Sequence, residues 1–183
     1  DVAALEGTGA TVVFAPSAAE MYPTGGSSTR VTGGPVAGRF EGRSRPGHFD
    51  GALTVVAKLL HIVAPDTALF GAKDAQQVFL VERMVRDLDL PVAIERVDIV
   101  REEDGLAKSS RNRFLDPGAR IAARALPAAL EAAASAASLG VDPLIGAAQG
   151  ALAGEDDVDL DYLAVVDPAT FEPVEDTHRG PAL

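Results

Sequence analysis

Two polar segments of this chain hold the side chains best suited to bind an anion. They are Gly71–Gln77 and Gly105–Asn112. In the first, Gly71 lets a ligand approach the backbone closely, and Lys73 adds an ammonium group at the start of an expected helix, whose positive end favours an anion. In the second, Ser109–Arg111 adds two hydroxyl donors and a guanidinium fork, which suit phosphate oxygens. Together the segments predict a polyphosphate site.

Both segments follow expected strands of one sheet. Short apolar runs predict the strands, and apolar residues at helical spacing predict two helices, the first capped by Asp50. The expected strands are Ala10–Phe14, Thr67–Phe70 and Pro91–Val100, the first two of them buried, and the helices are Asp50 to about Val63 and about Ala75 to Leu88. This alternation predicts an α/β fold with a parallel sheet. Ligands bind beyond the carboxyl ends of such strands, so the two polar segments should meet at one edge.

A different pattern follows the sheet, after a polar stretch that repeats at no regular period. The Asp116-Pro117 pair is a helix-start signal. The expected elements are a helix from Asp116 to Gly140, a second helix near Pro143–Leu152, and a strand over Val158–Val166. We therefore predict a boundary near Asp116, with an α/β domain in residues 1–115 and a small helical and antiparallel domain in residues 116–183.

Composition excludes several classes of protein. With 16 basic against 27 acidic residues, the formal net charge is −11, which argues against a general nucleic-acid binder. The chain has no cysteine, which excludes disulfides, thiolate metal sites and cysteine nucleophiles. No apolar stretch approaches the roughly 20 residues that a membrane helix needs. The absence of an export signal in these residues leads us to expect a cytoplasmic protein.

Simpler interpretations of the same residues remain open. A Lys-Asp pair at a helix start, such as Lys73 and Asp74, is also typical of an exposed capping pair. His48 can cap the helix that follows it. Gln76 and Gln77 can be ordinary helix surface, and we expect only one of them to face a ligand.

Four stretches together resemble the pantoate-beta-alanine ligase family of the nucleotidyltransferase superfamily, whose members form adenylates. They are Met21-Tyr22-Pro23, then Glu41-Gly42 with Arg45-Pro46-Gly47-His48-Phe49-Asp50-Gly51, then Phe70-Gly71-x-Lys73-Asp74-x-Gln76-Gln77, and Arg101-Glu102-x-Asp104-Gly105-Leu106-Ala107-x-Ser109-Ser110-Arg111-Asn112. The resemblance implies a Rossmann-like ATP- and pantoate-binding domain in the first 115 residues and a small α+β domain after it. It also implies a homodimer.

The resemblance implies a reaction in two steps. Pantoate attacks the α-phosphate of ATP, with Mg²⁺ accompanying the nucleotide, and the amine of β-alanine then displaces AMP to give pantothenate. The metal ligands are not implied. The implied roles are phosphate contacts for Lys73, Ser109, Ser110 and Arg111, ribose contacts for Gly71 and Asp74, adenine contacts for the backbone near Val100 and Lys108, a hydrogen bond to pantoate from Gln77, and a place beside the pantoate and β-alanine pocket for Arg45 and His48.

The sequence departs from the family in one large respect, since no His-x-Gly-His segment is present. In the family those histidines bind ATP, so we expect these 183 residues to be an internal portion of a longer enzyme and to lack ligase activity alone. Two alternatives stay open: another enzyme of the nucleotidyltransferase superfamily, and a non-catalytic fragment with half of a nucleotide site.

Overall fold

The computed structural model describes residues 2–178 and 180–183. The chain forms two compact units, one up to Arg30 and one from Val31 to Leu183. The segments on both sides of Asp116 belong to the larger unit. The predicted domain boundary near Asp116 stays a prediction. Among the described residues, no helix is long and apolar enough to cross a membrane.

The N-terminal unit contains two short helices, η1 (Val2–Leu5) and α1 (Ala18–Met21). Ser17 and Glu20 form a capping box at the start of α1. The prediction of a buried strand over Ala10–Phe14 is wrong, because this segment has no regular structure and Val12 is 82% exposed. An apolar β-branched run becomes a strand only where a neighbouring strand completes its hydrogen bonds, and the described residues give it none.

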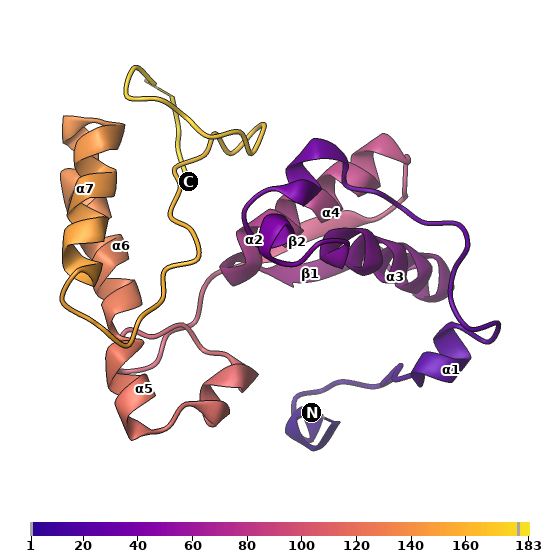
Figure 1. The fold of residues 1–183 in the computed structure, drawn as a ribbon. Helices are drawn as coiled ribbons and strands as arrows, with labels where there is room; N and C mark the ends of the chain where they lie inside the picture. Colours follow the sequence, from indigo (N-terminus) through magenta and orange to yellow (C-terminus); the bar gives the residue numbers. More distant parts are fainter. Residues whose placement is uncertain (1, 179) are drawn as a thin grey trace. The chain divides into compact units, whose positions relative to one another are not determined.

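The α/β part of the larger unit is a single strand, helix, strand crossover. Strands β1 (Thr67–Gly71) and β2 (Ala93–Val97) are parallel, with Thr67 opposite Ala93. They lie side by side in Figure 1, and helix α4 (Ala75–Asp87) connects them. The prediction that strand β1 is buried is wrong, because its residues alternate between exposed and half-buried. Only one face of the strand packs on the core. The parallel sheet and the α/β class are confirmed.

Helix α3 (His48–Val63) packs with α4 on the core. It begins two residues before the predicted cap, because Gly47 is its N-cap with φ of 78°. Asp50 therefore lies within the first turn, where its Oδ1 accepts a hydrogen bond from the Gly33 amide at 3.2 Å. The buried core around both helices is made of Val36, Phe49, Leu53, Ala57, Phe79, Leu80, Val81, Met84, Val166 and Phe171. Burying such side chains contributes roughly 1.5–3 kcal/mol each.

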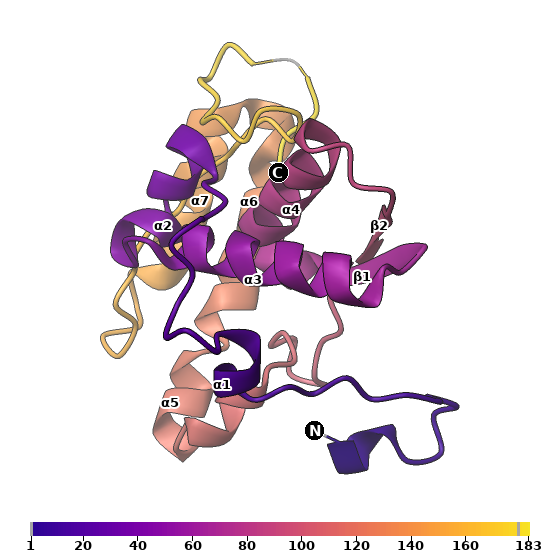
Figure 2. The ribbon, with the colours of Figure 1, turned by 90° about the vertical axis from the view of Figure 1, so that its right-hand side faces the viewer.

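Helices dominate residues 110–152, but not as one long helix followed by another. The observed elements are η4 (Ser110–Phe114), α5 (Pro117–Ala122), α6 (Ala125–Ala136), η5 (Ala137–Leu139) and α7 (Val141–Leu152). Asp116 caps α5 as predicted, with its Oδ1 accepting from the Ala119 amide at 2.8 Å. Helices α6 and α7 lie side by side in Figures 1 and 2, packed through Ala129, Ala133 and Ala148. Small side chains allow this close approach.

The described residues after α7 form no regular strand, so the strand predicted over Val158–Val166 is wrong. Isolated pairing occurs there between Val166 and Pro173 and between the backbones of Val166 and Leu183. Figure 2 shows this C-terminal segment, in yellow, passing beside α4. The apolar residues of this run are not buried in alternation, because the adjacent Val165 and Val166 are both buried while Leu160 is exposed.

Candidate active site

A cleft of about 590 Å³ lies within the larger unit, where the start of α3, the start of α4, η4 and the C-terminal segment meet. Its lining residues come from four stretches of sequence that are far apart. They are Phe40, Glu41, Arg45, His48 and Phe49; Lys73, Asp74, Ala75, Gln76 and Gln77; Ser109, Ser110 and Arg111; and Tyr162, Ala164, Val166, Phe171 and Leu183. The two polar segments of the sequence therefore meet at one site, as predicted.

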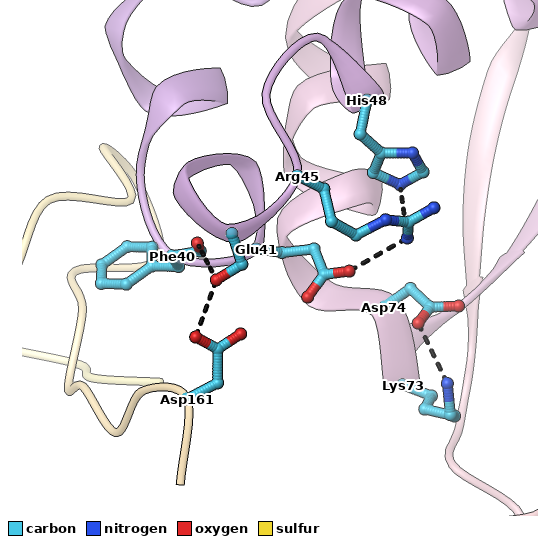
Figure 3. Close-up of polar contacts among 8 residues, drawn as sticks. Phe40, Glu41, Arg45, His48, Lys73, Asp74 and Asp161 are labelled. Atoms are coloured by element: carbon cyan, nitrogen blue, oxygen red, sulfur yellow. Dashed lines mark hydrogen bonds and ion pairs between the residues drawn. The ribbon is translucent and has the colours of Figure 1, made fainter. Parts of the chain in front are cut away.

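One side of the cleft, here named the Arg45 wall, consists of Glu41, Arg45 and His48. Glu41 lies on the short helix α2 (Glu41–Ser44), and the left-handed Gly47 turns the chain into α3. This turn brings Arg45 Nη1 to 3.0 Å from Glu41 Oε1 and 3.4 Å from His48 Nε2 (Figure 3). A guanidinium held between a carboxylate and an imidazole presents a fixed donor to an acidic ligand.

A second group of lining residues, here named the Lys73 wall, consists of Lys73 with Ser109, Ser110 and Arg111. Lys73 lies on η3 (Ala72–Asp74), directly before α4, and its Nζ is 3.1 Å from Asp74 Oδ1. Figure 3 shows this contact between Lys73 and Asp74 as a dashed line. The first residues of α4 also line the cleft, so the positive end of a 13-residue helix adds to the field at this wall.

Hydrogen bonds that involve backbone atoms hold the Ser109–Arg111 segment, and the Arg111 guanidinium takes no part in them. Ser109 Oγ accepts a hydrogen bond from the Arg111 amide at 3.2 Å, and the Asn112 side chain donates to the Ala107 carbonyl at 3.0 Å. Within the described part of the chain, the Arg111 guanidinium has no hydrogen bond or ion pair. The segment therefore presents a cation and two hydroxyls to an anion.

An ion pair fixes the loop that leads into this segment. Asp104 Oδ2 accepts from Arg120 Nη2 at 2.9 Å and from Nε at 3.1 Å, and Oδ1 accepts from the Leu106 amide at 3.2 Å. Desolvation opposes ionisation of Asp104, but the Leu106 amide and the Arg120 guanidinium outweigh it and lower the pKa of this carboxyl. Helix α5 thus anchors the loop that carries part of the Lys73 wall.

The C-terminal segment contributes Tyr162 to the cleft, which sequence reasoning missed. Burial raises the pKa of Tyr162, and the negative charges of Glu41, Asp161 and Asp74 raise it further. Its ring packs on Phe40 with centroids 5.6 Å apart. The only signal in the sequence was an aromatic residue in an expected strand, which looks the same as an ordinary core residue.

Eight of the predicted site residues line the cleft together: Arg45, His48, Lys73, Asp74, Gln77, Ser109, Ser110 and Arg111. Gly71, Val100 and Lys108 do not line it, although the Lys108 amide donates to the Val100 carbonyl at 2.8 Å. Both Gln76 and Gln77 line it, and that only one of them faces a ligand stays a prediction. Residues 2–178 and 180–183 contain no group of three or more acidic, histidine or cysteine side chains placed to hold a metal ion.

A comparison with protein families gives one match over the full chain. The sequence model of the pantoate-beta-alanine ligase family matches residues 1–183. The chain belongs to this family. A curated family member, the pantothenate synthetase of Leifsonia xyli subsp. xyli, is 60% identical over 183 residues, which is 100% of this chain and 63% of that protein. This chain therefore spans less than two thirds of the length of that relative.

Solved structures of family members share the fold. A pantothenate synthetase from Thermus thermophilus is 46% identical with a TM-score of 0.92, covering 98% of this chain and 66% of its own. A pantoate-beta-alanine ligase from Francisella tularensis, complexed with beta-gamma ATP and beta-alanine, is 37% identical with a TM-score of 0.65, covering 70% of this chain and 49% of its own. These likenesses confirm the predicted family and its nucleotidyltransferase-like fold.

Proposed function

We propose that the protein to which this chain belongs joins pantoate to β-alanine, using ATP, through a pantoyl adenylate. The observation that carries the proposal is the cleft, which brings together the Lys73 wall and the Arg45 wall in a chain of the pantoate-beta-alanine ligase family. Three substrates that carry one triphosphate and two carboxylates need such a divided site. One wall suits the triphosphate, and the other suits a carboxylate.

The Lys73 wall would hold ATP. Lys73 and Arg111 neutralise the charge that builds up on the leaving pyrophosphate, and Ser109 and Ser110 donate hydrogen bonds to phosphate oxygens. Asp74 and Gly71 would bind the ribose, and the backbone near Val100 and Lys108 would bind the adenine. The likeness to a family member complexed with beta-gamma ATP supports this assignment.

Mg²⁺ would enter with the nucleotide, because Mg²⁺ is commonly held by substrate phosphates with one or two carboxylates rather than by a protein cage. The described residues suit this arrangement, since they offer no cluster of three ligands. When bound, the ion screens the charge of the triphosphate. The protein itself then contributes binding, orientation and fixed positive charge.

The Arg45 wall and Gln77 would hold the acid and the amine. Gln77 hydrogen-bonds pantoate, so that one carboxylate oxygen faces the α-phosphorus. In the first step this oxygen forms a bond to phosphorus, while the bond between phosphorus and the bridging oxygen breaks and pyrophosphate leaves. In the second step the β-alanine amine attacks the pantoyl carbonyl, loses a proton, and AMP leaves. Both steps depend mainly on position and charge.

The test is release of pyrophosphate by the protein as its gene encodes it, assayed without β-alanine. We expect release that requires both ATP and pantoate, and formation of pantothenate and AMP when β-alanine is added. Release with a different carboxylic acid instead of pantoate would favour another enzyme of the superfamily. Binding of ATP without release of pyrophosphate under any condition would favour a non-catalytic nucleotide site.

A further inference from the structure

Gln76 is the most deeply buried polar side chain of the cleft lining, with 7% of the residue exposed. Its Nε2 atom donates two hydrogen bonds, to the Val36 carbonyl at 2.9 Å and to the Arg39 carbonyl at 3.0 Å. Both acceptors belong to the turn around η2 (Gly34–Gly38), which lies 37 and 40 residues earlier in the sequence. The side chain therefore ties α4 to a distant stretch of backbone.

The amide can take only one orientation. With Nε2 facing two carbonyl oxygens, both of its N–H groups are used. The reverse orientation would set Oε1 against two acceptors. In the observed orientation Oε1 is buried without a partner among the described residues, which is unfavourable. The two hydrogen bonds that Nε2 donates therefore outweigh the unfavourable burial of Oε1. These two hydrogen bonds are the contribution that a glutamine makes at position 76.

The tethered turn leads directly into the Arg45 wall. Phe40 follows Arg39 and has φ of 47° and ψ of −120°, a conformation that L-residues rarely adopt. Glu41 comes next, and Gly42 packs so closely on the Ala37 carbonyl that a Cβ atom there would overlap it. The backbone between the tether and Arg45 is thus tightly constrained, so the position of the tether determines the position of the wall.

We propose that Gln76 is a positioning residue that sets the Arg45 wall at a fixed distance from Gln77 and Lys73. Gln76 and Gln77 are neighbours in α4, and Lys73 directly precedes that helix. A side chain of the helix that begins directly after Lys73 therefore holds the backbone that leads into the Arg45 wall. The kinetic consequence rests on the proposed function, whereas the tether itself does not.

Thr54 provides a matched control. It is also buried, at 8% exposed, and its Oγ1 accepts from the Val31 amide at 3.0 Å and donates to the Asp50 carbonyl at 2.6 Å. Thr54 thus anchors the beginning of the stretch whose end Gln76 anchors. The variant Thr54→Val removes one buried tether while leaving the bonds to Val36 and Arg39 in place.

The experiment compares Gln76→Met with Thr54→Val in the protein as its gene encodes it. Met fills a similar volume but has no donor, and the milder Gln76→Asn keeps the amide on a side chain one methylene shorter. The first readout is hydrogen exchange of the Glu41–Arg45 amides. We expect about tenfold faster exchange in both Gln76 variants and less than about twofold in Thr54→Val, because local opening follows the lost tether.

The second readout is steady-state kinetics. Gln76→Met should raise the KM for pantoate and β-alanine about tenfold and leave the KM for ATP within about twofold, whereas Thr54→Val should leave all three unchanged. Equal changes in the two variants, or unchanged exchange in Gln76→Asn, would overturn the proposal and make Gln76 an ordinary core residue. Faster exchange in a protein that forms no pantoyl adenylate would support the tether and contradict only the proposed function.

Discussion

The two walls of the cleft differ in how their charged side chains are paired within the protein. The Arg45 wall is internally paired, with Arg45 on Glu41 at 3.0 Å. Ser44 Oγ also donates to Asp161 Oδ1 at 2.7 Å, and Arg39 pairs with Glu172, so the C-terminal segment braces this side. On the Lys73 wall, Lys73 pairs with its sequence neighbour Asp74 at 3.1 Å, and the Arg111 guanidinium has no partner among the described residues.

This difference indicates separate tasks. Groups that are already paired keep their geometry without a ligand and so determine which ligand fits. A cation such as Arg111, which lacks a partner among the described residues, gains most of its interaction energy when an anion arrives, and the gain grows as charge accumulates in the transition state. We therefore expect substitutions in the Lys73 wall to lower the rate of the chemical step. Substitutions in the Arg45 wall, or of Gln77, should instead weaken the recognition of pantoate.

The largest effect is expected from Lys73→Ala. Removing the ammonium should lower pantoyl adenylate formation in a single turnover by orders of magnitude, a loss on the order of several kcal/mol in the transition state. Its pair with Asp74 is exposed and adds little stability, so the melting temperature should stay unchanged. Arg86→Ala removes an exposed cation at the other end of α4 and is the matched control. An unchanged single-turnover rate in Lys73→Ala would contradict the assignment.

A smaller and more selective effect is expected from Gln77→Ala. If the amide binds pantoate, its loss should raise the KM for pantoate about tenfold to a hundredfold and leave the KM for ATP nearly unchanged. Initial rates at varied concentrations of each substrate measure both constants. Equal increases for the two substrates would assign Gln77 to the general structure of the cleft.

The smallest effect is expected from Asp104, whose ion pair with Arg120 anchors the loop that leads to Ser109. The pKa of Asp104 lies below its ordinary value of 3.8, so its ion pair with Arg120 stabilises the fold above that value and is lost as the pH falls through the lowered pKa. Asp104→Asn should lower the urea midpoint slightly and equally from about pH 7 to about pH 5, and the difference should shrink below about pH 4. A difference that is the same at every pH would show that the charge of Asp104 is irrelevant.

The sequence predicted the elements that border the cleft better than it predicted the strands at either end of the chain. Gly71, Lys73 and the start of α4 are specified locally, by a strand end and a helix start, and the structure has these features where expected. The strand predictions over Ala10–Phe14 and Val158–Val166 were wrong, because an apolar run does not reveal whether a partner strand exists.

The side chains that were missed act through distant contacts. The role of Gln76 depends on carbonyls of Val36 and Arg39, and the packing of Tyr162 depends on Phe40. No local pattern separates such residues from helix surface or from ordinary core. The homodimer and the cytoplasmic location stay predictions, since both depend on surfaces and signals that a single folded chain does not reveal.

The most direct test of the proposed chemistry follows the oxygen atoms of the acid. With pantoate labelled with ¹⁸O in both carboxylate oxygens, one labelled oxygen should appear in AMP for each pantothenate formed, because the attacking oxygen stays on phosphorus when the amine displaces AMP. Mass spectrometry of the AMP measures this transfer. Unlabelled AMP, or label found in inorganic phosphate with ADP as the other product, would contradict an adenylate formed in this cleft.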